Sequence, residues 1–508
     1  MSADKKNISN SSNQEIAAGF SFKKLFSDVA VYSSGNLLIK GLSLISAPIF
    51  TRIFSPDQYG AWSLINVMVA FFTGILLLGG DNAYTRYFFL CKDEREKQTL
   101  SATWFSFLAL WSIVVLIAIL PFSKSISIWM MGEESYRAAW VIGLASSPLA
   151  MMNLILAQAL RNRFRAKAYT LFNLATAILT IGLAVLFVLV FKLGVAGALL
   201  GAATASLVMI PPRLWAIRDL LNRSFSVTFL KQLLIFGLPL VPMNIAFWLF
   251  SNADRIMLAR LASLDSVGIY AIAGSMAAVI MMLQNAIGQS WLPHGIRVYE
   301  EEHDSAEKIF SRTMIFLLAA SGFIIVGFVS LAQEVLFILV PPAYHNAFWV
   351  IPFLAVGFLF FTSAHVSVVA IMVKNKTTYI MFACWLIAIV NIVLNTLLIP
   401  RFGIIGAGAS TGISYMLFSL SYALISRRLW PVSYKTKSLV LLFAVPTASI
   451  IAITLIALHG PGTMLNLILK LTVLLLCGAA LLFITAQSEQ ISFSYFVEKG
   501  KALLKKRR

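Results

Sequence analysis

Residues 52–64 read RIFSPDQYGAWSL, and residues 260–272 repeat this pattern as RLASLDSVGIYAI. Five positions agree at an offset of 208, namely Arg52 with Arg260, Ser55 with Ser263, Asp57 with Asp265, Gly60 with Gly268 and Trp62 with Tyr270. A second pair of stretches, KLGVAGA at 192–198 and RFGIIGA at 401–407, agrees at an offset of 209. Because two unrelated landmarks share nearly one offset, the sequence predicts an internal duplication.

Composition places the duplicated units in a membrane. Of 508 residues, 59% are apolar and 12% are charged, and the mean hydropathy is +0.85, whereas soluble domains carry about 25% charged residues. Such a chain cannot cover a water-facing surface, which excludes nucleic-acid-binding, disordered and disulfide-scaffold proteins as descriptions of the whole chain. The three cysteines (Cys91, Cys384 and Cys477) are far apart and give no metal spacing and no evident disulfide. We expect neither a metal nor a cofactor.

Spanning segments follow from the lengths of the apolar stretches. A helix needs about 20 mostly apolar residues to cross a bilayer, and the sequence contains fourteen such windows. We therefore expect an all-α polytopic membrane protein with fourteen transmembrane helices. The windows are 30–53, 57–79, 99–120, 137–159, 170–191, 195–215, 232–252, 265–290, 310–331, 347–372, 379–399, 404–425, 438–458 and 463–485.

Two parallel six-helix lobes are expected, because an even number of spans brings both copies of the repeat into the membrane from the same side. Parallel repeats are related by an axis along the membrane normal, and helices 13 and 14 are extra. The expected divisions are a cytoplasmic tail and interfacial helix at 1–29, the N-lobe at 30–216, the C-lobe at 217–428, helices 13 and 14 at 429–485, and a basic cytoplasmic tail at 486–508.

The distribution of charge predicts the orientation. The chain has 40 Lys and Arg residues against 21 Asp and Glu residues, giving a net charge of +19. If the N-terminus is cytoplasmic, most of the basic residues fall in cytoplasmic segments, Arg213 among them, which is the positive-inside pattern. The sequence therefore predicts cytoplasmic termini, and the orientation accounts for most of the charge without an anionic partner such as nucleic acid.

The repeated motif has two interpretations. Ser55, Pro56 and Gln58 resemble a capping box at a helix start, with Asp57 near the positive end of the helix dipole. Ser263 and Asp265 would do the same in the second copy. The alternative is a role in gating or substrate contact.

Small residues and prolines predict how the helices pack and bend. The glycine pairs 197/201 and 408/412 have the spacing that lets membrane helices approach closely. Pro48, Pro239 and Pro242 fall in the first helix of each half, where they would free backbone carbonyl groups and allow bending.

Three stretches carry a resemblance to a known family: TRIFSPDQYGAWSL at 51–64, PLVPMNIAFWLFSNADRIML at 239–258 and VGIYAIA at 267–273. Together with fourteen predicted spans and a six-plus-six repeat, they resemble bacterial oligosaccharide flippases of the O-antigen translocase type. These proteins form part of the polysaccharide transport branch of the multidrug/oligosaccharidyl-lipid/polysaccharide exporter superfamily. The resemblance covers about residues 27–485 and does not identify a particular glycan.

This resemblance implies a transporter rather than an enzyme, located in the bacterial inner membrane. Members of the family move an undecaprenyl-pyrophosphate-linked oligosaccharide across that membrane for surface polysaccharide biosynthesis. They alternate access between the two lobes and draw on an ion gradient or the membrane potential. The implied partners are the lipid-linked oligosaccharide, membrane lipids, and the polysaccharide polymerase and chain-length machinery.

Lys40 is the most deeply placed charge in the predicted spans. It lies about ten residues into the first window, roughly 15 Å deep at about 1.5 Å per residue, near the middle of a ~30 Å core. An ionised lysine at that depth costs about 2.5–3.5 kcal/mol on insertion scales. We expect Lys40 to face a cavity and meet the lipid pyrophosphate. The alternative is a lysine that snorkels or pairs within the protein, with Asp81 as the candidate partner.

Four arginines are further candidates for contact with the pyrophosphate, because the planar guanidinium bonds phosphate bidentately. Arg52 and Arg260 occupy matched positions in the two halves, where they would either attract a diphosphate or anchor the helices at the interface. Arg86 is either a cavity base or part of a positive loop. Arg255 either pairs locally with Asp254 or closes an outer gate against helix 1.

Amide side chains are the candidate sugar contacts. We expect Asn244, Asn252 and Gln284 to act as a set beside aromatic residues such as Trp248. Single polar residues in membrane helices are also commonly hydrogen bonds between helices, which is the alternative.

Four groups are candidates for ion coupling: Asp81, Asp254, Glu334 and His365. His365 is expected in the middle of the tenth span, where it would either exchange protons near neutral pH or be hydrogen-bonded inside the bundle. Lys470 is expected about one and a half turns inside the last span, from where its side chain would snorkel.

Competing functions make different demands on the charges. A multidrug or cation antiporter of the same superfamily needs buried carboxylates, and Asp81 is the only acid near the core of the first six predicted helices. A peptidoglycan-precursor flippase would need the same basic cavity as an oligosaccharide flippase. A membrane glycosyl polymerase or ligase needs catalytic groups in a sizeable outer loop, and the outer loops here are short.

The topology makes a direct prediction for reporter fusions. Fusions after Lys97, Lys167 and Lys437 should report the cytoplasm, and fusions after Ser135 and Gly462 should report the outer side, because of the charge asymmetry of the loops. Reversal at two of these sites would refute the predicted orientation.

Overall fold

The computed structural model describes residues 38–39, 41–42, 45–222, 224–301, 303–458 and 464–489, and these residues form helices joined by short connections. Twelve helices in the described part are long and apolar enough to cross a membrane. Eleven of them each correspond to one predicted window. The prediction of an all-α polytopic membrane protein is confirmed.

The one remaining helix of the twelve contains two predicted windows. Helix α15 runs from Thr377 to Leu429, but Gly403 inside it has φ 55° and ψ −129°, which is not helical. A break at that point separates the windows 379–399 and 404–425. Part of the first window, 30–53, lies outside the described residues, namely 30–37, Lys40 and 43–44; residues 45–53 are helical.

The chain forms two compact units. Unit 1 contains residues 1–46, 65–128 and 133–242, and unit 2 contains residues 47–64, 129–132 and 243–508. In both units the described residues are only those given above. Helix α3 (Pro56–Leu77) therefore begins in unit 2 and ends in unit 1. The chain changes unit again after Pro242, directly after the short 3₁₀ turn Leu238–Leu240 that contains Pro239. A bend at these prolines stays a prediction.

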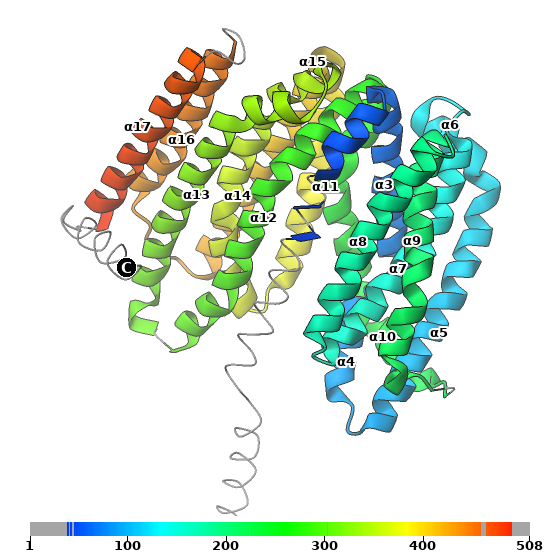
Figure 1. Cartoon of the computed structure of the whole chain (residues 1–508). Helices are drawn as coiled ribbons and strands as arrows, with labels where there is room; N and C mark the ends of the chain where they lie inside the picture. Colours follow the sequence, from blue (N-terminus) through cyan, green and yellow to red (C-terminus); the bar gives the residue numbers. More distant parts are fainter. Residues whose placement is uncertain are drawn as a thin grey trace, which may run out of the picture. The chain divides into compact units, whose positions relative to one another are not determined.

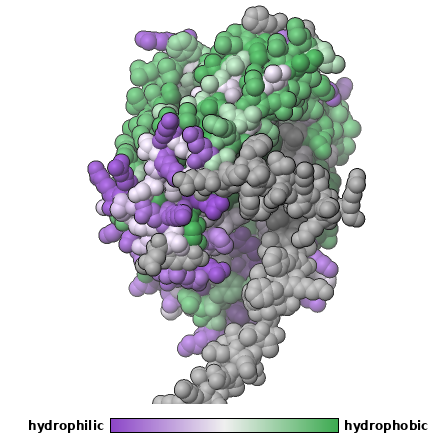
Figure 2. Space-filling model, turned by 90° about the vertical axis from the view of Figure 1, so that its left-hand side faces the viewer, coloured by the Kyte–Doolittle hydropathy of each residue, from purple (hydrophilic) through white to green (hydrophobic). Residues whose placement is uncertain are grey.

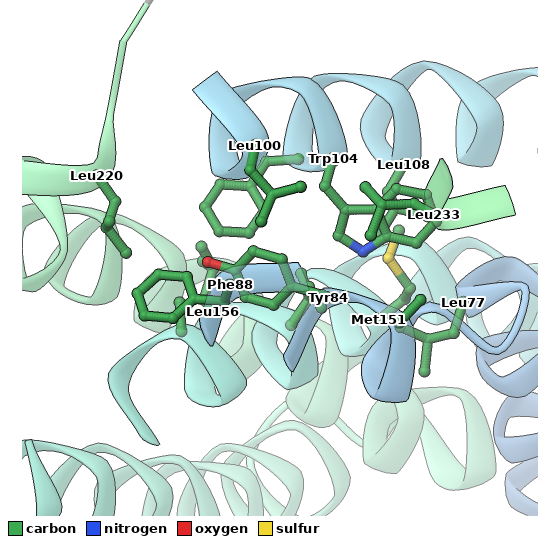
Figure 3. Packing of buried hydrophobic residues seen from close by; sticks show 14 of the residues in the cluster. Leu77, Tyr84, Phe88, Leu100, Trp104, Leu108, Met151, Leu156, Leu220 and Leu233 are labelled. Atoms are coloured by element: carbon green, nitrogen blue, oxygen red, sulfur yellow. The ribbon is translucent and has the colours of Figure 1, made fainter. Parts of the chain in front are cut away.

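Unit 1 is a bundle of helices around an aromatic core. Its elements after α3 are α4 (Gly80–Leu90), α5 (Glu94–Ile119), most of α6 (Ser123–Met131), α7 (Arg137–Asn162), α8 (Ala166–Leu189), α9 (Gly194–Ala216) and α10 (Val227–Gly237). Figure 3 shows the side chains of Tyr84, Phe88 and Trp104 packed with leucines of the neighbouring helices. The Tyr84 hydroxyl and the Ser101 Oγ are 2.8 Å apart, so the buried phenol keeps a hydrogen-bond partner.

Unit 2 holds the second half of the repeat and the C-terminal helices. Its elements are the start of α3, then α11 (Val241–Leu261), α12 (Leu264–Glu301), α13 (His303–Leu339), the 3₁₀ segment η4 (Pro342–Val350), α14 (Ile351–Val373), α15, α16 (Thr436–Ala457) and α17 (Met464–Glu489). Helices α16 and α17 lie side by side along α13 (Figure 1). The closest partner of α15 is α14, which also packs on α12.

The two copies of the repeated motif contact each other reciprocally inside unit 2. A Cβ atom added to Gly60 would overlap the carbonyl oxygen of Leu264, and one added to Gly268 would overlap the carbonyl oxygen of Pro56. Pro56 and Leu264 are themselves matched at the offset of 208. Gly60 of the first copy meets Leu264 of the second, and Gly268 of the second copy meets Pro56 of the first. A two-fold axis produces such a reciprocal contact. The glycines are there because the two helix starts approach at backbone distance.

The second landmark also repeats in the structure. Gly194 and Gly403 both have φ 55°, a left-handed conformation that glycine adopts without steric cost. A Cβ atom at Gly201 would overlap the backbone nitrogen of Ala184, and one at Gly412 would lie 2.5 Å from the carbonyl oxygen of Phe353. The predicted close packing at the small-residue spacings is confirmed.

Capping at the two motif copies differs in detail. The backbone N–H of Ser266 donates to the Ser263 hydroxyl at 3.2 Å, so Ser263 caps α12 as predicted. At the first copy the Ser55 backbone N–H donates to the Gln58 side chain at 3.4 Å, which is one half of a capping box. The Ser55 hydroxyl donates instead to the Asp57 carboxylate at 2.5 Å.

The outer surface is apolar over broad areas. Large hydrophobic side chains such as Leu475 and Phe483 of α17 point outward. Figure 2 shows a continuous hydrophobic area on one face, next to a zone where hydrophilic residues gather. This is the surface of a protein whose surroundings are lipid rather than water.

The reciprocal glycine contact predicts equal effects for two distant substitutions. Gly60→Ala and Gly268→Ala should each lower stability by about 1–3 kcal/mol, because the new methyl group would force the two helix starts apart. Thermal unfolding of the purified protein in detergent measures this loss.

Gly182→Ala is the matched control, since a Cβ atom there would meet nothing within 4 Å. It should be neutral or slightly stabilising, because alanine favours a helix more than glycine does. If Gly60→Ala and Gly268→Ala differed widely, the contact would not be the two-fold one described above.

Candidate functional site: an aromatic cavity in unit 2

Helices α11, α14 and α15 enclose a cavity of about 620 Å³. Aromatic and aliphatic side chains make most of its wall, and amide, hydroxyl and imidazole groups interrupt them. The lining residues are Met243, Asn244, Phe247, Trp248, Ser251, Asn252, Phe361, Ala364, His365, Val368, Ile380, Cys384, Phe418 and Tyr422. Aspartate, glutamate, lysine and arginine are absent from these described lining residues, so the cavity suits a neutral, polar ligand with flat apolar faces.

One face of α11 supplies the polar wall. Asn244, Trp248, Ser251, Asn252 and Arg255 are spaced by three, four or one residues, which places them along one side of a helix. From Asn244 to Arg255 this face extends for about 16 Å at about 1.5 Å per residue. The Asn252 Nδ2 donates to the Trp248 carbonyl oxygen at 3.1 Å.

A second cavity of about 310 Å³ continues from the first. The two cavities share Phe247, Ser251 and Phe361 as lining residues. Asp254 and Arg255 line only the second cavity, and α12 contributes residues that include Asn285. The uncharged cavity therefore adjoins one that contains an acid and a base.

Asp254 is buried and fully engaged by neighbours. Its carboxylate accepts hydrogen bonds from the Tyr270 hydroxyl, from the Thr411 hydroxyl at 3.2 Å and from the Arg255 backbone N–H at 2.8 Å. These bonds come from α11, α12 and α15, so the carboxylate connects three helices. Such a set of partners stabilises a carboxylate inside a membrane protein.

Arg255 is half-buried, and its Nε has no hydrogen-bond partner. A terminal nitrogen of its guanidinium approaches Gly274 so closely that a Cβ atom there would lie 3.2 Å away. An arginine with an unused donor beside a cavity is a candidate for binding an anionic group.

The predicted sugar contacts separate into two kinds. Asn244 and Asn252 both line the 620 Å³ cavity. Gln284 does not: it is 2% exposed, and its Oε1 accepts a hydrogen bond from the Thr362 hydroxyl at 3.0 Å. This bond joins α12 to α14, so Gln284 matches the alternative of a hydrogen bond between helices.

The other predicted basic residues are distributed over both units. Arg86 belongs to unit 1, where its guanidinium lies 4.9 Å from the ring centre of Phe236. Arg52 and Arg260 belong to unit 2 and are exposed, and Arg260 lies 5.7 Å from the ring centre of Trp129. A shared cationic cavity that includes Lys40 stays a prediction.

Asp81 lies in the first turn of α4, where a carboxylate is favoured by the helix dipole. Helix α4 begins after a break in which Leu78 and Gly79 both have positive φ. Asp81 is half-buried and sits in unit 1. The pairing of Asp81 with Lys40 stays a prediction, because Lys40 lies outside the described part of the chain.

The expectation that Lys470 snorkels is wrong. Its side chain is 0% exposed, and its Nζ donates to Glu334 Oε1 and Gln333 Oε1 at 2.6 Å each. The reason is that α13 places an acid and an amide beside it, so the ammonium group is satisfied within the protein and has no need to reach the interface. A role of Glu334 in ion coupling stays a prediction.

Sequence reasoning also missed a buried cation in unit 1. The charge pattern places Arg213 among the basic residues of a cytoplasmic segment and does not predict that its side chain is only 1% exposed. Its guanidinium donates to Asn173 Oδ1 and Thr176 Oγ1 at 2.9 Å each. The available signal was its position inside the window 195–215, together with polar residues in the neighbouring window.

His365 lines the 620 Å³ cavity from α14, as expected for a residue in the middle of that span. Its Nε2 is buried and has no hydrogen-bond partner. The alternative prediction was that this histidine is hydrogen-bonded inside the bundle. Nε2 makes no such hydrogen bond.

The helices and their lengths define a multi-pass, all-α membrane protein fold. Among solved structures, the chain is similar to the lipid II flippase MurJ in an inward closed conformation, with TM-score 0.72, 14% identity, and coverage of 90% of this chain and 99% of that one. It is also similar to an inward-facing multidrug resistance MATE family transporter of the MOP superfamily, with TM-score 0.61, 14% identity, and coverage of 79% and 98%. At these identities the likeness shows the fold.

The family is shown by the sequence itself. A family model described as polysaccharide biosynthesis protein matches residues 25–298, more than half of the chain. The chain belongs to this family. A comparison with curated proteins finds no match.

The buried Lys470–Glu334 pair predicts a non-additive pair of substitutions. Lys470→Met should destabilise the protein by about 3–5 kcal/mol, because it leaves a carboxylate without its partner away from water. Lys470→Met combined with Glu334→Met should recover most of that loss, because neither charge then remains. Thermal unfolding in detergent measures both, and an additive double variant would contradict the pairing.

Proposed function

We propose that this protein is an alternating-access flippase that moves an undecaprenyl-pyrophosphate-linked oligosaccharide across the bacterial inner membrane. The product would serve surface polysaccharide biosynthesis of the O-antigen type. The termini lie in the cytoplasm, and the polysaccharide polymerase and chain-length machinery are its functional partners. Membership of the polysaccharide biosynthesis protein family and the fold shared with a lipid II flippase support the proposal.

The observation that carries the proposal is the polar face of α11. Asn244, Trp248 and Asn252 present amide groups and an aromatic surface to the larger cavity. The next turn presents Arg255 to the adjoining cavity, and the buried Nε of Arg255 has no hydrogen-bond partner. A sugar needs the first kind of surface and a pyrophosphate the second, and in a lipid-linked oligosaccharide these two groups are covalently joined.

A cation antiporter is the second candidate, because the MATE fold is shared. Such a transporter needs a carboxylate that is free to meet its substrate. The larger cavity has none among its described lining residues. Asp254, in the adjoining cavity, is engaged by Tyr270 and Thr411. These contacts favour the flippase.

A peptidoglycan-precursor flippase would also need a sugar-binding surface beside a cation. The two functions therefore differ only in the glycan that is carried. Ion coupling through Asp254, with Asp81 and Glu334 as the further candidates, is part of the proposal. Asp254 is the favoured group, because protonation or cation binding there would alter hydrogen bonds to three helices at once.

A deletion strain tests the function. Without the protein, lipid-linked oligosaccharide should accumulate on the cytoplasmic leaflet of the inner membrane, and surface polysaccharide should be lost. Leaflet location can be measured with a membrane-impermeant reagent that oxidises or labels the glycan, in inverted and in right-side-out vesicles. Accumulation on the outer leaflet would assign the defect to a later step and contradict the proposal.

Variants that restore the deletion strain test the basic contacts. Lys40→Ala and Arg255→Gln should abolish export while the protein still inserts and accumulates, because each removes a cation for the pyrophosphate. Lys40→Arg should keep part of the activity. The matched control is Arg401→Gln, an exposed arginine that lines neither cavity, and it should export normally. Normal export by both Lys40→Ala and Arg255→Gln would contradict the cationic site.

A further inference from the structure

We propose that His365 is a specificity-determining residue that hydrogen-bonds the glycan through its neutral imidazole, rather than a proton carrier. This inference rests on the proposed function and deepens it. It is carried by the position of the ring, by the way the ring is held, and by the unused nitrogen. The ligand class is a sugar ring bearing hydroxyl or acetamido groups.

The imidazole ring is fixed by its neighbours. A Cβ atom at Gly288 would overlap Nδ1 of His365, so the ring lies directly against the backbone of α12. Phe361, one turn earlier on α14, has its ring centre 4.8 Å from the imidazole centre. Contacts on both sides leave the ring little freedom to turn, which is the condition for a group that selects its ligand by geometry.

One nitrogen of this fixed ring is left without a partner. Nε2 is buried and unpaired, and a buried polar group without a hydrogen bond costs about 1–3 kcal/mol. His365 lines the cavity whose other polar groups include Asn244, Ser251 and Asn252. Nε2 is covered while the cavity is empty, so a bound hydroxyl or amide group would satisfy it once a small shift of the lining uncovers it, since a neutral imidazole nitrogen either donates or accepts.

Charges around the cavity argue against a role as proton carrier. From α11, α14 and α15, the described lining residues include no carboxylate that would stabilise an imidazolium. Asp254, which faces the adjoining cavity, is bonded to Tyr270 and Thr411 from α12 and α15. Arg255 beside it would repel a second cation. The ring is therefore placed for neutral hydrogen bonding.

Binding of two related ligands to the purified full-length protein tests this role. The first is the lipid-linked oligosaccharide extracted from the deletion strain, and the second is undecaprenyl pyrophosphate without a glycan. His365→Phe keeps a flat ring but loses the nitrogen. It should weaken binding of the first ligand about tenfold and leave binding of the second unchanged. His365→Gln should restore part of the difference.

Two further variants separate this role from a structural one. Gly288→Ala should weaken binding of the glycolipid by displacing the ring, and should add nothing in a protein that already carries His365→Ala. The matched control is His345→Phe. His345 lies in η4, and its Nε2 is within 3.1 Å of the Val340 carbonyl oxygen, so its replacement should leave the ratio of the two affinities unchanged.

The pH dependence of export distinguishes a hydrogen-bonding group from a proton carrier. His365→Gln should export with the same pH profile as the wild type, because no proton is exchanged at this position. Loss of the pH dependence, or an equal loss of both ligands in His365→Phe, would overturn the inference while leaving the flippase in place. If the wild type bound neither ligand, the proposed function itself would fail and the inference with it.

Discussion

Polar groups inside a membrane must find their partners within the protein, and this constraint explains most of the buried charges in this structure. Lys470 is paired with Glu334 and Gln333, and Asp254 is held by Tyr270 and Thr411. These groups connect helices and are costly to disturb. Against that background, an unpaired nitrogen beside a cavity indicates a place where a ligand completes the hydrogen bonding. Arg255 and His365 both offer one.

The internal repeat gives this arrangement its framework. The two copies of the motif meet at Gly60 and Gly268, where the helix starts contact each other through their backbones. The copy at 52–64 is part of unit 2, although the rest of α3 belongs to unit 1. The chain therefore changes unit within a continuous helix and again beside Pro242. Both points are natural places for the bend that the proposed alternating access requires.

Much of the fold could be predicted from the sequence, because lipid imposes simple rules on composition and length. The spans, the repeat and the close helix contacts at Gly201 and Gly412 all follow from apolar windows and spacing. The buried partners of Lys470 and Arg213 could not be predicted. A single helix shows how deep a charge lies along its own axis, but the partners come from other helices whose rotation the sequence pattern does not give.

The candidate site was predicted in part for the same reason. Asn244, Asn252 and Arg255 share one helix, so their common face follows from the helical period alone. Gln284 lies on α12, and only the packing shows that it faces Thr362 rather than the cavity. His365 was expected in mid-span, but its contact with Gly288 and its unpaired nitrogen depend on how α14 meets α12.

Translocation by the purified protein alone is the most direct measurement of the central claim. The protein is reconstituted into vesicles of bacterial phospholipid with the lipid-linked oligosaccharide inserted in one leaflet. A membrane-impermeant glycan-modifying reagent then reports the appearance of glycan on the other leaflet over time, with an ion gradient or a potential applied. The account predicts a rate well above that of protein-free vesicles and of vesicles carrying Arg255→Gln. A rate equal to that of protein-free vesicles under every gradient would contradict it.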